Sequence, residues 1–288
     1  MQAVLIQAHK NIDQVIKLSS LLRQKFEVYV HIDVKTHVSD GQRHEFTKLG
    51  VICISKVSVH WSGWSVAKAS IELMKEVLKN KDISYVHIIS GQDWPLMNID
   101  DIYDYYEGSK LAYVQSGLAR NIRKTGEPVI WWEQYYFYYD KINRKSTYGK
   151  IFHRISLIIQ TVLRINKFKE YNIELDMYTG SQWVDLPREM VEFLLKYLDE
   201  HPNLLRVFET GFCSDEFWIP TILLNSYKYK QLVVNNNHRF ISLEKKHGSF
   251  PAILDIEDFK NIKSGSYHFG RKFEKPYSTD LIKKLNIR

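Results

Sequence analysis

Short strand-like runs alternate with amphipathic helical segments through the first hundred residues of the chain. Apolar runs at 3–9, 27–35, 50–55 and 84–91 have the length of strands, and residues 65–80 place apolar side chains at helical spacing. This order predicts an α/β fold with a mostly parallel central sheet and helices on both faces. No linker, internal repeat or low-complexity tract interrupts the 288 residues, so we expect one compound domain.

Polar side chains follow three of these strands at the point where each strand ends. His9 follows the first, Asp33 follows the second, and the loop SGQDWP at 90–95, with Gln92 and Asp93, follows the last. Ligands of open α/β sheets bind outside the carboxyl ends of the strands, so these side chains predict a ligand site at one edge. Asp33 in such a place either hydrogen-bonds a ribose or uracil, or caps a turn.

Two tryptophan-containing segments each allow a structural and a functional interpretation. In HWSGWSVAKA, residues 60–69, Ser62 or Ser65 is placed to cap the following helix, and Ser65 is also a candidate ligand contact. In YTGSQWVDLP, Trp183 either forms a wall for an acceptor or belongs to the core. The aromatic content of 14% suits sugar-binding surfaces as well as a large aromatic core.

Charged pairs lie between large apolar residues at two places in the second half of the chain. GFCSDEFWIP sets Asp215 and Glu216 side by side, and burial of an ionised carboxylate is costly unless it is paired. This pattern indicates either acidic helix caps or an active-site base. FGRKF sets Arg271 and Lys272 between phenylalanines. Such cations bind diphosphate well, although the alternative is a solvated basic tail.

The net charge of +7 suits nucleic acid, an anionic membrane surface or an anionic substrate such as a nucleoside diphosphate. The cations follow no RNA-binding signature, which argues against nucleic acid. Residues 141–170 carry eight Lys and Arg and one acid around ISLIIQTVL. This segment predicts a basic amphipathic helix, either in peripheral contact with an anionic membrane or packed on the domain with solvated lysines.

Several motifs of other function classes are missing from the sequence. There is no Walker-type loop or G-x-G-x-x-G, and Cys53 and Cys213 have no metal-like spacing. There is also no Asp-x-Asp triplet, which many sugar-nucleotide transferases use to hold a metal, so a transferase of this kind would need protein cations instead. No secretory signal or apolar run of about 20 residues is visible, and we expect a cytoplasmic protein.

Seven short segments occur together in an order typical of one family. The chain resembles the core-2/I-branching β-1,6-N-acetylglucosaminyltransferase family, glycosyltransferase family 14, which also contains the peptide O-xylosyltransferases. The likeness runs from about residue 1 to 276 and is weak over 115–175. Two cysteines cannot supply the disulfides of the animal enzymes, so a bacterial member is expected. The segments are LIQAHK, VYVHIDVK, WSGWSVAKA, HIISGQDWPL, YTGSQWVDLPREMVEFLL, SDEFWIPTIL and HFGRKFEK.

The resemblance implies a Rossmann-like, GT-A-type nucleotide-sugar-binding fold over 1–288, with a nucleotide-binding half at 1–115 and an acceptor and catalytic half at 116–288. It implies an inverting transfer from a UDP-sugar, first of all UDP-N-acetylglucosamine, without metal or other cofactor. UDP-xylose, UDP-glucose, UDP-galactose and a non-catalytic glycan-binding relative are the alternatives. The expected setting is bacterial capsule or lipopolysaccharide synthesis on a lipid-linked glycan acceptor, in the cytoplasm or peripherally on the inner membrane.

The resemblance also assigns the two charged pairs. The family's catalytic base is the Glu of a Ser-Pro-Asp-Glu motif, and that position here is Glu216. Cys213 and Ser214 stand where the family has Ser and Pro, so the proline is lost and the acidic pair is kept. The family's diphosphate-binding Lys corresponds to Lys272, with Arg271 beside it as a helper. Asp215 is then expected to orient the loop or the acceptor.

The remaining donor contacts follow with less precise positions. Asp33 matches a strand-end Asp near the nucleoside, and Asp93 matches an Asp in a Gly-x-Asp-Phe-Pro segment. The family's second cation corresponds to Arg239, Lys245 or Lys246. The complete prediction for the donor is His9, Asp33, Ser65, Asp93, Arg239, Lys246, Arg271 and Lys272, and for the acceptor Gln92, Trp183 and Asp215.

Overall fold

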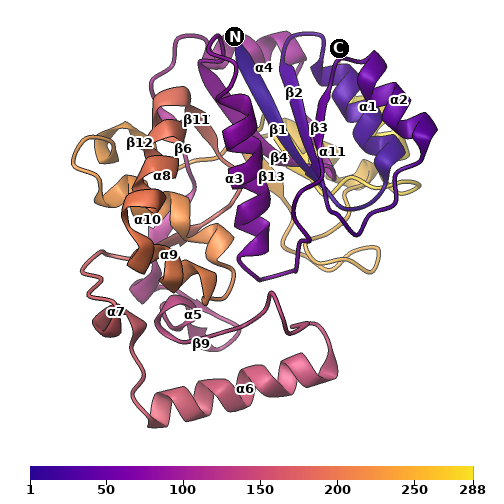
Figure 1. Cartoon of the computed structure of the whole chain (residues 1–288). Coiled ribbons are helices and arrows are strands. Elements are labelled where there is room, and N and C mark those ends of the chain that lie inside the picture. Colours follow the sequence, from indigo (N-terminus) through magenta and orange to yellow (C-terminus); the bar gives the residue numbers. More distant parts are fainter. Residues whose placement is uncertain (288) are drawn as a thin grey trace.

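A seven-stranded sheet forms the centre of the computed structural model, which describes residues 1–287 (Figure 1). The strand order is β12-β6-β11-β4-β1-β2-β3, and every neighbouring pair is parallel except the two pairs that include β11. The predicted α/β fold with a mostly parallel sheet is therefore confirmed. The strands are β1 (Gln2–Ala8), β2 (Glu27–Ile32), β3 (Ile52–Ile54), β4 (Tyr85–Ser90), β6 (Ala112–Tyr113), β11 (Asp185–Pro187) and β12 (Val233–Val234).

The central strand β1 separates two apolar cores. Successive side chains of a strand point to opposite faces, so Ala3 and Leu5 enter one core while Val4 and Ile6 enter the other. Helices cover both faces, which explains why β1 and β4 are apolar along most of their length. The helices of this half are α1 (Ile12–Leu22), α2 (Asp40–Lys48), α3 (Ser65–Val77) and α4 (Ile99–Tyr106).

The chain reverses its direction of winding between β1 and β4. It runs from β1 through β2 to β3 on one side of the sheet, and then returns to place β4 on the other side of β1. Gln7 pairs with Ser90 at the carboxyl ends of these two strands. Such a switch point leaves a crevice where α/β proteins bind ligands, so the loops after Ala8 and Ser90 mark the expected site.

A small three-stranded sheet brings the C-terminal part of the chain to this edge. Strand β14 (Phe269–Arg271) lies between β13 (Arg239–Ile241) and β5 (Asp93–Pro95). In this register Arg271 lies opposite Asp93. Two charged residues separated by most of the sequence therefore meet beside the end of β4.

The second half of the chain is mainly helical, and α6 lies at the far end of the molecule from β1 and β2 (Figure 1). Helix α6 begins at Thr147 because the Ser146 hydroxyl accepts a hydrogen bond from the backbone N–H of Gly149 at 3.0 Å. It ends at Val162, shortly before Arg164 takes a left-handed conformation with φ 53°. The helix within 141–170 is therefore shorter than the whole basic segment.

The predicted helix near Pro187 begins at Arg188, directly after this proline, and is helix α8. The other helices are α5 (Trp131–Gln134), α6 (Thr147–Val162), α7 (Lys167–Glu170), α8 (Arg188–Glu200), α9 (Pro202–Glu209), α10 (Trp218–Asn225), α11 (Phe259–Lys263) and α12 (Thr279–Leu285). The remaining strands are β7 (Ser116–Leu118), β8 (Arg123–Lys124), β9 (Glu127–Pro128) and β10 (Tyr178–Gly180).

Candidate functional site

Asp93 occupies the loop that follows β4 and is almost fully buried. One carboxylate oxygen, Oδ2, accepts a hydrogen bond from the backbone N–H of Ser90 at 3.0 Å. The other, Oδ1, has no hydrogen-bond partner within the described chain and lies 3.5 Å from Nε of Arg271. Burial raises the pKa of Asp93, and the nearby Arg271 charge opposes this rise. The two side chains thus form a loose pair that has polar atoms left for a ligand.

Arg271 is the link between this pair and the acidic turn at 214–216. Its guanidinium lies over the ring of Trp183, with 4.4 Å from Cζ to the ring centroid. Burial lowers the pKa of Arg271, whereas the charges of Asp93 and Glu216 counteract the effect, so Glu216 lies within electrostatic range. Trp183 is buried and belongs to the core. Its contact with Arg271 also places it beside the candidate site.

Lys272 follows on the same strand end and is held by the loop before it. Its Nζ donates to the hydroxyl of Ser249 at 3.1 Å and to the carbonyl of Phe250 at 3.2 Å. Burial, followed by the charges of Arg271, Lys10 and Lys145, lowers the pKa of Lys272 to about 8. Glu274 opposes this effect only in part, so the cations around Lys272 outnumber the carboxylates, and an anionic group would suit this environment.

Lys10 is a member of this cluster that sequence reasoning missed. Its Nζ forms an ion pair with Glu274 at 2.7 Å, and Nε2 of Gln92 donates to the same carboxylate oxygen at 2.9 Å. Lys10 directly follows His9 at the end of the first strand, so its position along the sequence was a usable signal. The loops after β1 and β4 and the chain after β14 therefore meet through Glu274.

Lys145 is the second missed cation, and it comes from the segment that leads into α6. Its Nζ lies 4.9 Å from the ring centroid of Trp61. Desolvation of the ring lowers the pKa of His9, and the charges of Lys10, Arg271 and Lys145 add to that effect. Lys145 is therefore close to both His9 and Lys272, although no local sequence pattern marks it.

The loop at 60–65 anchors this segment to the sheet. The backbone N–H of Ser65 donates to both carboxylate oxygens of Asp140, at 3.1 and 3.2 Å. The hydroxyl of Ser65 accepts from the backbone N–H of His60 at 2.7 Å. The N-cap of α3 is Trp64 without a side-chain hydrogen bond, so the prediction that Ser62 or Ser65 caps this helix is wrong. Ser65 stabilises the loop instead.

Asp33 is anchored in the turn after β2. Its Oδ1 accepts hydrogen bonds from the backbone N–H groups of Lys35 at 3.0 Å and Val59 at 3.3 Å. These bonds match the turn-capping alternative. They leave Oδ2 facing only Lys35, whose Nζ is 3.4 Å away, so a nucleoside contact of Asp33 stays a prediction.

The acidic pair lies in a short 3-10 turn at Ser214–Glu216 that several hydrogen bonds hold in place. Cys213 takes a left-handed conformation with φ 56°, and its backbone N–H donates to the carbonyl of Ser62 at 3.0 Å. The hydroxyl of Ser214 donates to Oε1 of Glu133 at 2.5 Å. Ser214 stands where the family has a proline, whose side chain cannot donate a hydrogen bond. In this chain the Ser214 hydroxyl therefore holds the turn to the buried carboxyl of Glu133.

The two acids of the pair have different surroundings. Burial, and next the charge of Glu216, raise the pKa of Asp215 to about 8. The side chain of Glu216 is 31% exposed, and its Oε2 accepts from Nζ of Lys124 at 3.1 Å. Glu216 is thus the acid that can reach a bound acceptor, and Asp215 is the one that lies behind it.

A second buried acid and a buried amine support this turn from behind. Burial raises the pKa of Glu133 to about 8 and lowers the pKa of Lys167 to about 7. Nζ of Lys167 donates to the carbonyl of Val207 at 2.8 Å and to the hydroxyl of Thr210 at 3.0 Å. Sequence reasoning missed both residues, because the aromatic block around Glu133 resembles ordinary core.

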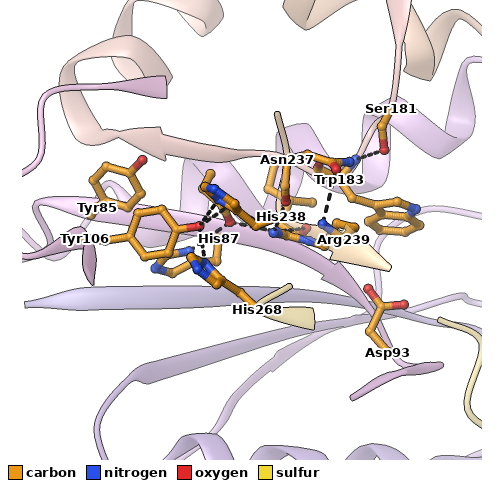
Figure 2. A network of polar contacts seen from close by, with 12 residues as sticks. Tyr85, His87, Asp93, Tyr106, Ser181, Trp183, Asn237, His238, Arg239 and His268 are labelled. Atoms are coloured by element: carbon orange, nitrogen blue, oxygen red, sulfur yellow. Dashed lines mark hydrogen bonds and ion pairs between the residues drawn. The ribbon is translucent and has the colours of Figure 1, made fainter. Parts of the chain in front are cut away.

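Arg239 lies outside the cation cluster, in a separate polar network. Figure 2 shows its guanidinium aimed at the sheet, where it donates to both oxygens of Asp185 at 2.9 and 2.6 Å. Its side chain is 1% exposed. These contacts commit Arg239 to holding β13 against β11, which argues against its predicted role as the second diphosphate cation.

Lys246 is also committed elsewhere. Its Nζ lies 2.6, 3.2 and 3.3 Å from carboxylate oxygens of Asp255, Glu257 and Asp258. Because three carboxylates already balance the positive charge of Lys246, this amine is not available to a diphosphate. Lys245, the other candidate, is exposed. The cations that the structure brings within electrostatic range of Lys272, besides Arg271, are Lys10 and Lys145.

The site has no recognisable metal-ligand set. Among residues 1–287, no three His, Cys, Asp or Glu side chains group in a way that could hold a metal ion. The charged groups that converge at the switch point are instead several cations with the carboxylates of Asp93 and Glu274.

A match to a known protein family identifies the family of this chain. The family model described as Core-2/I-Branching enzyme matches residues 5–263. The chain belongs to this family. Glu216 and the switch-point loops lie within the matched range, and Lys272 lies shortly after it.

Curated relatives are distant and longer than this chain. The β-glucuronosyltransferase GlcAT14A of Arabidopsis thaliana is 24% identical over 65% of this chain and 39% of its own length. The β-glucuronosyltransferase GlcAT14B of the same plant is 27% identical over 34% of this chain and 23% of its own length. The xylosyltransferase sqv-6 of Caenorhabditis elegans is 21% identical over 94% of this chain and 34% of its own length. The chain therefore spans well under half the length of these relatives.

Among solved structures, the bifunctional glycosyltransferase WbbM in its apo form matches 99% of this chain and 50% of its own chain, with a TM-score of 0.45 and 11% identity.

Proposed function

We propose that this protein is an inverting glycosyltransferase that moves a sugar from a UDP-sugar to a hydroxyl group of a glycan. The observation that carries the proposal is the convergence of Lys10, Lys145, Arg271 and Lys272 at the switch point of the sheet, with Glu216 within electrostatic range of Arg271. Such a cluster suits a diphosphate, because each cation is worth more when it is preorganised in a partly dry site. Family membership supports the same reaction class.

The proposed chemistry is a single displacement. Glu216 takes the proton of the acceptor hydroxyl while that oxygen attacks the anomeric carbon, and the bond from this carbon to the UDP oxygen breaks. Arg271 and Lys272 stabilise the negative charge that grows on the departing UDP. The proposal includes no metal, and the four cations support this choice because they supply positive charge of the kind that a divalent ion supplies in other transferases.

The donor sugar is the finer part of the proposal. UDP-N-acetylglucosamine is the first choice, as for the animal branching enzymes of the resemblance. The names of the relatives add UDP-glucuronic acid and UDP-xylose to the set to be tested, together with UDP-glucose and UDP-galactose. A thermal-shift screen of these sugars, with UDP as reference, identifies the donor by the largest stabilisation.

We also propose that the acceptor is a lipid-linked glycan of surface polysaccharide synthesis and that α6 contacts the membrane. Ile151, Ile155, Ile158 and Val162 recur every three or four residues and are 53, 51, 65 and 74% exposed. An apolar stripe beside basic residues is the pattern of an interfacial helix on an anionic surface. In the described part of the chain, every helix is too short or too polar to cross a bilayer.

Two assays test this proposal. Turnover of the best UDP-sugar, by hydrolysis or transfer, separates an enzyme from a glycan-binding relative, and EDTA should leave it unchanged. A strict Mn²⁺ requirement would contradict the metal-free reaction. Flotation with phosphatidylglycerol vesicles tests the membrane contact, and Ile155→Ser with Ile158→Ser should weaken it while urea unfolding changes by no more than about 0.5 kcal/mol.

A further inference from the structure

A cavity of about 340 Å³ lies between α6 and the hairpin formed by β8 and β9. Arg144, Lys150 and Arg154 line it on the side of α6, and Glu127 lines it on the side of the hairpin. The size suits a phosphoryl or diphosphoryl group with part of an attached residue. None of the predicted donor or acceptor contacts lies in its wall, so it is separate from the switch-point site.

The charge of the cavity is positive and unbalanced. Within the described chain Arg144, Lys150 and Arg154 form no ion pair, and the buried Nε of Arg144 has no hydrogen-bond partner. Glu127, whose oxygens accept from Nε1 of Trp132 at 2.9 Å and face Nε2 of His153 at 3.2 Å, offsets the charge of only one of these three cations. An unpaired guanidinium donor in a basic cavity points to an anionic ligand with several oxygen acceptors.

The cavity lies beside the exposed apolar stripe of α6. Lys150 and Arg154 are one helical turn apart, on the strip between the buried face and the stripe of Ile151, Ile155 and Ile158. Cations at that edge of an interfacial helix reach the depth of lipid headgroups while the apolar stripe lies among the acyl chains. The cavity cations therefore lie next to the apolar stripe, which fits a ligand whose anionic group is attached to a lipid.

The opposite wall of the cavity leads to the catalytic candidate. Glu127 in β9 pairs in register with Lys124 in β8, and Nζ of Lys124 donates to Oε2 of Glu216 at 3.1 Å. One short hairpin thus contacts the cavity at one strand and the proposed base at the other. The hairpin therefore links the wall of the cavity to the side chain of Glu216.

We infer that this cavity binds the phosphoryl group that joins a lipid to the acceptor glycan. The inference rests on the proposed function, because it assigns the acceptor side of that reaction. Arg144, Lys150 and Arg154 take the phosphoryl oxygens, and the stripe of α6 takes the start of the lipid. Gly149 allows this arrangement, since a Cβ there would lie 2.9 Å from Cα of Arg144 and would push Arg144 away from α6.

The test compares vesicles that differ in the type of anionic headgroup. Phosphatidylcholine vesicles that contain geranylgeranyl diphosphate are compared, by co-flotation, with vesicles of equal charge that contain phosphatidylglycerol. We expect wild type to prefer the diphosphate lipid by about tenfold, as two or three charge-assisted contacts give. Inorganic pyrophosphate in solution is the second arm and should bind much more weakly, because it lacks the lipid.

A matched pair of double variants locates the preference. Lys150→Gln with Arg154→Gln should abolish it, whereas Lys141→Gln with Lys169→Gln, which removes two exposed cations of the same segment outside the cavity, should retain it. Equal loss in both double variants, no preference in wild type, or equally tight binding of free pyrophosphate would overturn the inference. Thermal unfolding of each variant shows that it is folded, and the single Arg154→Gln is the milder version.

Turnover of the UDP-sugar by wild type is measured in the same preparations. Turnover without the lipid preference rejects the cavity assignment and keeps the proposed transferase. The lipid preference without turnover rejects the transferase and keeps the phosphoryl site.

Discussion

Asp185 and Asp215 are both buried carboxylic acids, yet their surroundings give them opposite properties. Burial alone would raise the pKa of Asp185, but the charge of Arg239 and the hydrogen bond of His87 hold this pKa well below its usual range. Tyr106, labelled in Figure 2 with His87 and Arg239, donates to the same carboxylate at 2.8 Å, so three neighbours hydrogen-bond to Asp185. Asp215 has no such cation in contact, and its pKa rises to about 8.

The network around Asp185 stabilises the fold, whereas the turn that contains Asp215 is the candidate for catalysis. The acceptor capacity of Asp185 is used by its own neighbours, and cross-strand pairing of Asp185 with His87 fixes β11 on β4. The turn at Ser214–Glu216 is supported from behind by Glu133, while Glu216 keeps its carboxylate partly exposed. A buried charged group therefore does not by itself identify an active site, and the partly exposed Glu216 makes the turn the better candidate.

The largest effect should come from the open site. Glu216→Gln removes the proposed base and should lower transfer by about 10²–10⁴-fold, because general base catalysis supplies that much. UDP binding, measured by calorimetry, should stay near the wild-type value. Glu244→Gln, at an exposed position, is the control and should retain full activity. Normal turnover in Glu216→Gln would remove this residue from the mechanism.

The closed site should respond in stability instead. Arg239→Met leaves Asp185 buried without its main partner and should lower the free energy of unfolding by about 3–5 kcal/mol, measured in urea. Lys245→Met, an exposed cation of the same part of the chain, should change it by less than about 0.5 kcal/mol. A small effect in Arg239→Met accompanied by weak UDP binding would instead return Arg239 to the donor site.

The two sites should also give opposite dependences of stability on pH. The folded chain holds a proton on Asp215 between its reference pKa of 3.8 and about 8, so the contribution of this group is present in acid and is lost as the pH rises through about 8. Asp185 has a lowered pKa, so its contribution is present above about pH 4 and is lost as the pH falls further. Asp215→Asn should flatten the neutral slope in urea unfolding. An unchanged slope would mean that Asp215 is ionised when folded.

The smallest effect should come from Lys145, the cation of the cluster that belongs to the segment before α6. Lys145→Ala should weaken UDP binding by about 3–10-fold, because it removes one of four charges and this one is exposed. The loss should shrink at high salt. Lys141→Ala is the control at a nearby exposed position. Unchanged UDP affinity in Lys145→Ala would confine the diphosphate to Lys10, Arg271 and Lys272.

Local patterns predicted the sheet well, and contacts between distant segments less well. The apolar runs placed β1, β2 and β4 correctly because a strand buried on both faces needs continuous apolar residues. The family motif located Glu216. Nothing near Arg239 reveals that Asp185, which lies 54 positions earlier, will hold its guanidinium. Lys145 is equally silent in the sequence, since its role depends on how Asp140 ties its segment to the loop at 60–65.

Two consecutive residues near the start of the basic segment lie at different proposed sites. Arg144 lines the cavity beside α6, and Lys145 lies over Trp61 within electrostatic range of Lys272. Adjacent side chains share one stretch of backbone, so a ligand that orders one restricts the other. If donor binding tightens the cavity in this way, binding in the cavity must tighten the donor site by the same factor, because linkage between two sites is reciprocal. UDP-sugar would then bind most tightly to the protein that already has an acceptor bound.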